Sequence, residues 1–166
     1  MSANSRQVGG SHYSSQYQHW DWCIAIGLHY LLSAATKYLC RWRNKNGLQD
    51  VEKAGHYLDK YIEVLPIGIR DRSTLSRQFI AAETQRWLDT NNITGSERVA
   101  CWTMATWNDR DDLIRAREAI NAIIETYRND ESELMHKHHQ ENFKEAVYQA
   151  RQRYIADGDE SIHAKE

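Results

Sequence analysis

The sequence predicts an all-α protein, a helical bundle of about six to seven helices. Apolar residues recur at helical spacing from Tyr17 to Ile155, and no stretch shows the alternation of a strand. The 166 residues include a single proline, Pro66. A chain of this length can bury a packed core without disulfides or a structural metal, and its 6 tryptophans and 9 tyrosines would supply that core.

Three helices are predicted in the first half, at residues 17–26, 28–44 and 48–64. Each places its apolar residues on one side. The first ends at Gly27, and the pair Asn46-Gly47, which is typical of a turn, closes the second. Pro66 and Gly68 then predict a linker, because proline cannot continue a helix.

Further helices are predicted at residues 75–88, 97–107, 109–127 and 131–155. Ser73 or Thr74, then Ser96, and then Asn108 are the expected N-caps of the first three. The predicted organisation is one compact domain made of a flexible tail (1–11), a helical unit with the candidate site (12–66), a second helical unit (67–130), a C-terminal helix (131–157) and a frayed tail (158–166).

The two halves align without a gap when the chain is shifted by 65 residues. The shift pairs Trp22 with Trp87, Ala35 with Ala100, Trp42 with Trp107, Leu48 with Leu113, and Ala54 with Ala119. Both halves are therefore candidates for the same three-helix unit, related by a pseudo-twofold axis; chance is the alternative. The charges do not repeat, so we expect the chemistry in the first half.

The charge balance excludes some classes of protein. With 21 basic and 23 acidic residues, the chain lacks the positive field that extended nucleic-acid binding requires. No stretch approaches the length and apolarity of a membrane span, and the N-terminus has no apolar signal region. Three unclustered cysteines suit the core of a protein in a reducing compartment, so we expect a cytoplasmic protein that does not bind membranes.

A phosphate-sized group of cations is predicted in the second helix. Lys37, Arg41 and Lys45 are spaced i, i+4, i+8, which places them on one side of a helix. Arginine offers a bidentate fork to phosphate oxygens, and lysine a mobile point charge. The alternative is that these cations only complement the negative end of the helix.

Two further sets of residues could take part in the same chemistry. Asp50, Lys53 and Tyr57 in the third helix can share a face that presents an acid, a base and a stacking ring. The alternative is an exposed ion pair of little value. His12 and Tyr13 lie in a polar segment and offer groups suited to proton transfer or base stacking.

Taken in order, these motifs resemble the phage SaV-like family, a domain of unknown function. The resemblance covers about residues 11–64 and rests on His12-Tyr13, Lys37-Tyr38-x-x-Arg41, Lys45-x-Gly47, Asp50-x-x-Lys53-Ala54 and Tyr57-Leu58. A well-known relative is a phage deoxynucleoside monophosphate kinase without a P-loop. The resemblance implies a small helical protein, encoded by a phage and located in the host cytoplasm. The chain has Ser33-Ala34 where relatives usually have Gly-Asn.

Together, the residues and the resemblance lead to the hypothesis of phosphoryl transfer between nucleotides. Lys37, Arg41, Lys45 and Lys53 would bind phosphate, Tyr13 or Tyr57 would stack on the base, and His12, Asp50 and Lys53 would act in catalysis. A nucleoside triphosphate would be the phosphate donor, no cofactor would stay bound, and the need for magnesium is left open. Glu133-x-x-His136 is too sparse to predict a protein metal site.

Two alternatives belong to other functional classes. The same pocket could sequester nucleotides or a cyclic signalling nucleotide without turnover, or the protein could be an adaptor whose last helix binds a host protein. That helix carries an apolar strip of Phe143, Val147, Ala150 and Tyr154. The strip predicts a homo-oligomer, with packing against the second half as the alternative.

Overall fold

The computed structural model describes residues 17–65 and 75–163, with side chains up to residue 149. It confirms the all-α prediction: the described residues form six α-helices and no strand. The helices are α1 (His19–Ala25), α2 (Tyr30–Arg41), α3 (Leu48–Val64), α4 (Arg77–Thr90), α5 (Gly95–Thr106) and α6 (Arg110–His163), with a 3-10 turn, η2 (Trp42–Asn44), after α2.

Some predicted helix ends differ from the structure. α3 has the predicted bounds, whereas α2 ends at Arg41 because the next three residues tighten into η2. The N-cap of α4 is Ser76, whose hydroxyl accepts a hydrogen bond from the Phe79 N–H. The N-cap of α5 is Thr94 instead of Ser96.

The largest error concerns the C-terminal helices. The sequence predicts a break near residues 128–130 and a second helix from residue 131, but α6 is one helix from Arg110 to His163. Asn129 and Asp130 are only moderately poor helix formers, and no proline or glycine accompanies them. Gly158 does not end the helix either, since a single glycine costs only about 1 kcal/mol.

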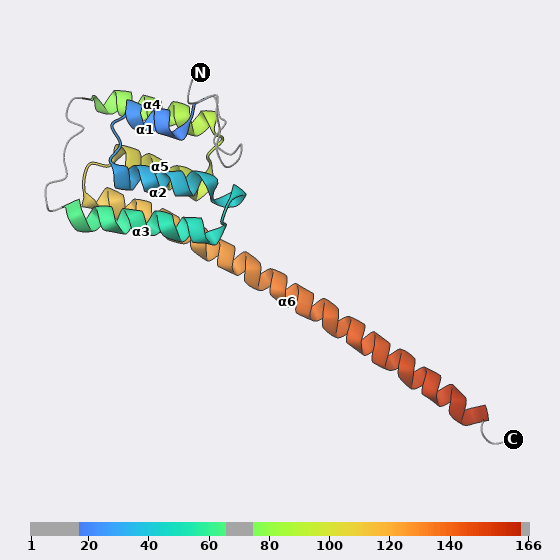
Figure 1. The fold of residues 1–166 in the computed structure, drawn as a ribbon. Helices are drawn as coiled ribbons and strands as arrows, with labels where there is room; N and C mark the ends of the chain where they lie inside the picture. Colours follow the sequence, from blue (N-terminus) through green and yellow to red (C-terminus); the bar gives the residue numbers. More distant parts are fainter. Residues whose placement is uncertain (1–16, 66–74, 164–166) are drawn as a thin grey trace. The chain divides into compact units, whose positions relative to one another are not determined.

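The chain divides into two units, residues 1–125 and 126–166. In the first unit, α2 packs against α3 and α5, and α1 packs against α4 (Figure 1). Its core is built from apolar side chains of all six helices. The largest fully buried ones are Trp22, Trp87, Ile26, Leu32, Leu39, Leu58, Leu88, Met104, Leu113 and Ile120.

The backbone of the first unit repeats at the predicted offset. Adding 65 to the bounds of α2 gives the bounds of α5. Gly27, after α1, has a φ of 60°, and its counterpart Asn92, after α4, has a φ of 52°. The next residue donates its N–H back into the helix in both halves, from Leu28 over 2.9 Å and from Ile93 over 3.0 Å.

The repeated tryptophans meet in the core. Trp22 and Trp87 are both buried, and their rings stack on each other with centroids 3.8 Å apart and planes 1° apart. Of the second pair, Trp42 is buried and Trp107 is half-buried. These matched positions support a duplicated three-helix unit.

The second unit is the C-terminal part of α6. Its large apolar side chains are exposed, including Phe143 and Val147 of the predicted strip. Ala150 and Tyr154 lie outside the residues whose side chains are described, so self-association stays a prediction. None of the described helices combines the length and the apolarity that a membrane crossing needs.

Candidate functional site

A buried carboxylate organises the face where α2 meets α3. Asp50 is fully buried, and its two carboxylate oxygens receive three partners. Arg41 Nε donates to Oδ2 over 2.9 Å, Asn46 Nδ2 donates to Oδ1 over 3.0 Å, and Lys53 Nζ lies 3.5 Å from Oδ1. The carboxylate therefore fixes one cation from each helix.

The connection between the helices brings these groups together. The η2 turn is closed by a hydrogen bond of 2.9 Å from the Gly47 N–H to the Trp42 carbonyl. Gly47 has a φ of 55° and a ψ of −138°, a backbone conformation that residues other than glycine adopt only with strain. It starts α3 so that Asp50 falls in the first helical turn, where the helix dipole favours a negative charge.

The surroundings of Asp50 keep it ionised. Burial raises the pKa of this carboxyl, but the hydrogen bonds from Asn46 and Arg41 and the charges of Arg41 and Lys53 outweigh burial and lower the pKa below its usual value. Two cations around one anion leave this group with a net charge of about +1 at neutral pH. Such a group can hold an anion at its outer side.

Aromatic rings lie beside the cations. The Arg41 guanidinium carbon is 4.5 Å from the centroid of the Tyr38 ring, and Lys53 Nζ is 5.7 Å from it. Tyr57 stacks on Tyr38 with centroids 5.6 Å apart and planes 20° apart. We call Tyr38, Arg41, Asp50, Lys53 and Tyr57 the α2–α3 cluster.

The structure brings together four of the predicted site residues: Arg41, Asp50, Lys53 and Tyr57. Lys53 lies on the same face as Arg41, since both cations approach the Asp50 carboxylate. Sequence reasoning did not include Tyr38 or Asn46 among the site residues. Tyr38 could have been found from its position three residues before Arg41 on α2. Asn46 lies before the start of α3, so helical spacing gives no signal for it.

The remaining predicted residues are placed differently. α2 ends at Arg41, so the helical spacing used to group three cations does not extend to Lys45, which is exposed. Lys37 is also exposed, and its charge acts on His19. His12 and Tyr13 lie outside the described residues.

A second polar group lies in the core beside the tryptophan stack. The His19 ring meets Trp22 and Trp87 edge-on, and its Nε2 lies 2.9 Å from Thr36 Oγ1. Burial, and then the charge of Lys37, lower the pKa of His19 to about 3. Burial raises the pKa of the neighbouring Cys23 thiol to about 12, so this thiol is not a nucleophile at neutral pH.

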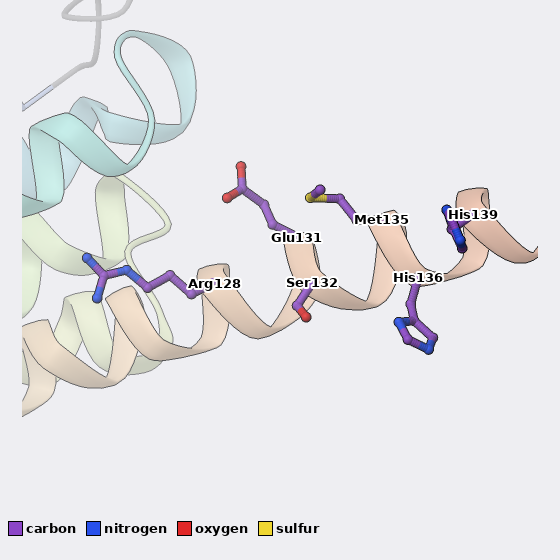
Figure 2. Close-up of a pocket in the computed structure, with 6 residues that line it drawn as sticks. All are labelled: Arg128, Glu131, Ser132, Met135, His136 and His139. Carbon is purple, nitrogen blue, oxygen red and sulfur yellow. The ribbon is translucent and has the colours of Figure 1, made fainter.

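A shallow pocket lies along α6, in the second unit. It is lined by Arg128, Glu131, Ser132, Met135, His136 and His139. All six come from one helix, and Figure 2 shows Glu131 and Met135 pointing away from one side of it and His136 from the other. In the described part of the chain, no three His, Cys, Asp or Glu side chains are grouped closely enough to hold a metal ion.

The comparisons with known proteins give one match. Residues 10–59 match the family model described as a protein of unknown function, DUF3310. This segment includes the whole α2–α3 cluster and nearly coincides with the stretch of the resemblance seen in the sequence. No curated protein and no solved structure matches the chain.

Proposed function

We propose that the α2–α3 cluster binds nucleotides and that the protein transfers a phosphoryl group between them. The observation that carries this proposal is the fully buried Asp50, which holds Arg41 and Lys53 side by side next to two stacked tyrosines. A buried ion pair is weak support for stability in itself. Its cost is understandable where the cations must be kept in place for a ligand.

Each residue of the cluster has a distinct part in this proposal. Arg41 and Lys53 bind phosphate oxygens, and Asp50 positions both cations without touching the ligand. Tyr57 offers its ring to the base. In the reaction, a nucleoside monophosphate oxygen attacks the terminal phosphorus of a nucleoside triphosphate, the bond to the bridging oxygen breaks, and two nucleoside diphosphates result. Positioning and charge neutralisation supply most of such catalysis.

The roles of four further residues and of magnesium are predictions of the same proposal. His12 is proposed to accept or orient a proton, and Tyr13 is a second candidate for stacking on the base. Lys37 and Lys45 are exposed cations that can guide anions to this face. Magnesium, carried in by the triphosphate, would neutralise charge on the transferred group. A phage origin and a place in the host cytoplasm belong to the same proposal.

The test is to incubate the purified protein with mixed nucleoside mono- and triphosphates and to separate the products by chromatography. We expect nucleoside diphosphates to accumulate with the intact protein. Arg41→Ala should abolish most of this activity, and Thr106→Ala, at the matching position of the second half, should not. Binding without any product would contradict phosphoryl transfer and support the sequestering alternative.

Calorimetry tests the binding step by itself. Arg41→Ala removes a charged hydrogen-bond donor and should weaken nucleotide binding by roughly 1.5–3 kcal/mol. Thr106→Ala is again the matched control. Unchanged affinity in Arg41→Ala would show that Arg41 only complements the negative end of α2 and does not bind the nucleotide.

A further inference from the structure

A buried carboxylate of the second half holds the turn that leads into the α2–α3 cluster. Glu97, in the first turn of α5, is 8% exposed. Its Oε1 accepts a hydrogen bond of 3.0 Å from Trp42 Nε1 and also pairs with the Arg43 guanidinium. That guanidinium lies over the Trp42 ring, 4.4 Å from its centroid. One carboxylate oxygen therefore holds two of the three side chains of η2.

The backbone of η2 connects this contact to the cluster. The Trp42 carbonyl accepts from the N–H groups of Lys45 over 3.4 Å and of Gly47 over 2.9 Å. The Gly47 carbonyl then accepts from the Asp50 N–H over 3.0 Å. Arg41, which directly precedes Trp42, forms the ion pair with Asp50. A shift of the Trp42 side chain is therefore passed on to both members of this ion pair.

The second half shows that a tryptophan at this place does not need a carboxylate for the fold. Leu32 matches Glu97 and is fully buried. Trp107 matches Trp42, and its Nε1 has no hydrogen-bond partner in the described residues. An unmade hydrogen bond of this kind costs about 1–3 kcal/mol, and the second half folds in spite of it.

The buried carboxylate and the cluster occur together. The positions that match Arg41 and Asp50 hold Thr106 and Arg115, which cannot form the ion pair of the cluster. The half that has the cluster is thus the half whose tryptophan is tied to a carboxylate. The helix dipole favours an acid in the first turn of α5, but it does not require that the acid be buried against Trp42.

We propose that Glu97 is a positioning residue of the α2–α3 cluster. Its carboxylate holds Trp42 and Arg43, and it thereby keeps η2 in the conformation that sets the cations of the cluster for an anion. Glu97 itself does not touch the ligand. This inference rests on the nucleotide binding proposed above, and it gives the second half of the molecule a part in the same site.

The first experiment is calorimetric titration of the full chain with dTMP, in the intact protein, in Glu97→Leu and in Glu97→Gln. Leucine is the residue at the matching position and offers no acceptor, whereas glutamine keeps an oxygen that can accept from Trp42. We expect Glu97→Leu to weaken dTMP binding about tenfold, because displaced cations forfeit about one charge-assisted hydrogen bond to the phosphate. Glu97→Gln should restore most of the affinity.

Thr84→Val is the matched control. It removes the acceptor of Trp22 Nε1, a hydrogen bond to another core tryptophan, and should leave the affinity for dTMP unchanged. Circular dichroism checks that each variant is folded. Trp42→Phe keeps an aromatic ring and removes the donor, so it serves where Glu97→Leu does not fold, and it should weaken dTMP binding as well.

Amide hydrogen exchange gives a second readout, which needs no nucleotide. The N–H groups of Gly47 and Asp50 should exchange about tenfold faster in Glu97→Leu, and Glu97→Gln should restore their protection. The Leu28 N–H, which is bonded at the end of α1, is the internal reference. A loss of global stability alone would speed exchange at all three positions.

Equal dTMP affinities in the intact protein and in Glu97→Leu would overturn the inference and leave the proposed function standing. Exchange that accelerates equally at Gly47 and Leu28 would also overturn it, because Glu97 would then only stabilise the fold. If dTMP does not bind the intact protein, the proposed function fails, and the exchange rates alone decide whether Glu97 holds the turn.

Discussion

The first and second halves of the molecule share a backbone plan and differ in their charges. Asp50 and Lys53 correspond to Arg115 and Glu118, so the signs are reversed at both positions. Asp50 is fully buried between the helices, whereas Arg115 is largely exposed and pairs with Asp112 on its own helix. The second half therefore folds with an exposed cation at the position of Asp50, and the carboxylate that it buries, Glu97, matches Leu32 instead. The fold does not require a carboxylate at the position of Asp50.

The tryptophans show a similar difference inside the core. Trp22 Nε1 donates to Thr84 Oγ1 over 3.3 Å, but the matching Trp87 faces His19, and its Nε1 has no hydrogen-bond partner in the described residues. Likewise, Trp42 Nε1 donates to Glu97 Oε1 over 3.0 Å. Leu32 stands at the position that matches Glu97 and offers no acceptor to Trp107. The two halves share their apolar packing and differ in these hydrogen bonds.

The largest expected effect on stability comes from replacing Asp50, the residue at the centre of the α2–α3 cluster. Asp50→Ala leaves Arg41, which is mostly buried, without its carboxylate, and should lower the free energy of unfolding by about 3–5 kcal/mol. Arg115→Ala, at the matching exposed position, should change it by no more than about 0.5 kcal/mol. Urea denaturation measures both. Equal losses of unfolding free energy in the two variants would mean that positions 50 and 115 contribute equally to stability.

A smaller effect on the free energy of unfolding is expected from lowering the pH, through His19 beside the tryptophan stack. His19 has a pKa near 3 in the folded protein, where burial and then the charge of Lys37 disfavour the imidazolium, against about 6.5 when unfolded. The contribution of the neutral His19 to the free energy of unfolding is therefore complete above pH 6.5 and is lost progressively as the pH falls toward 3. Between pH 7 and pH 5 the loss should be about 2 kcal/mol.

His19→Thr provides the control, because Thr84 holds the matching position. This variant should lose most of the pH dependence between pH 7 and pH 5. His29, whose pKa burial also lowers, accounts for a remainder of the same sign. Denaturation curves at several pH values decide, and an unchanged slope in His19→Thr would assign the effect to other groups.

Periodicity in the sequence predicted the structural features that depend on residues close together in the chain. The bounds of α3, the offset between the halves and the shared face of Asp50 and Lys53 all follow from spacing along the chain. The stack of Trp22 on Trp87 depends on how α1 meets α4, which spacing along the chain does not encode. Tyr38 was not predicted as a site residue, because an aromatic ring at helical spacing serves equally well in a core and as a platform for cations.

The smallest expected effect tests the matching helix ends at Gly27 and Asn92. Both residues have positive φ, which costs an alanine about 1 kcal/mol relative to glycine, so Gly27→Ala should destabilise the protein by that amount. Asn92→Ala should cost less, because asparagine already bears part of this cost. Gly27→Asn copies the second half into the first, and should cost less because asparagine tolerates this conformation. Thermal unfolding of the three variants measures the differences. If Gly27→Ala unfolds at the original temperature, the end of α1 relaxes where that of α4 does not, and the two halves are less alike than their backbone angles indicate.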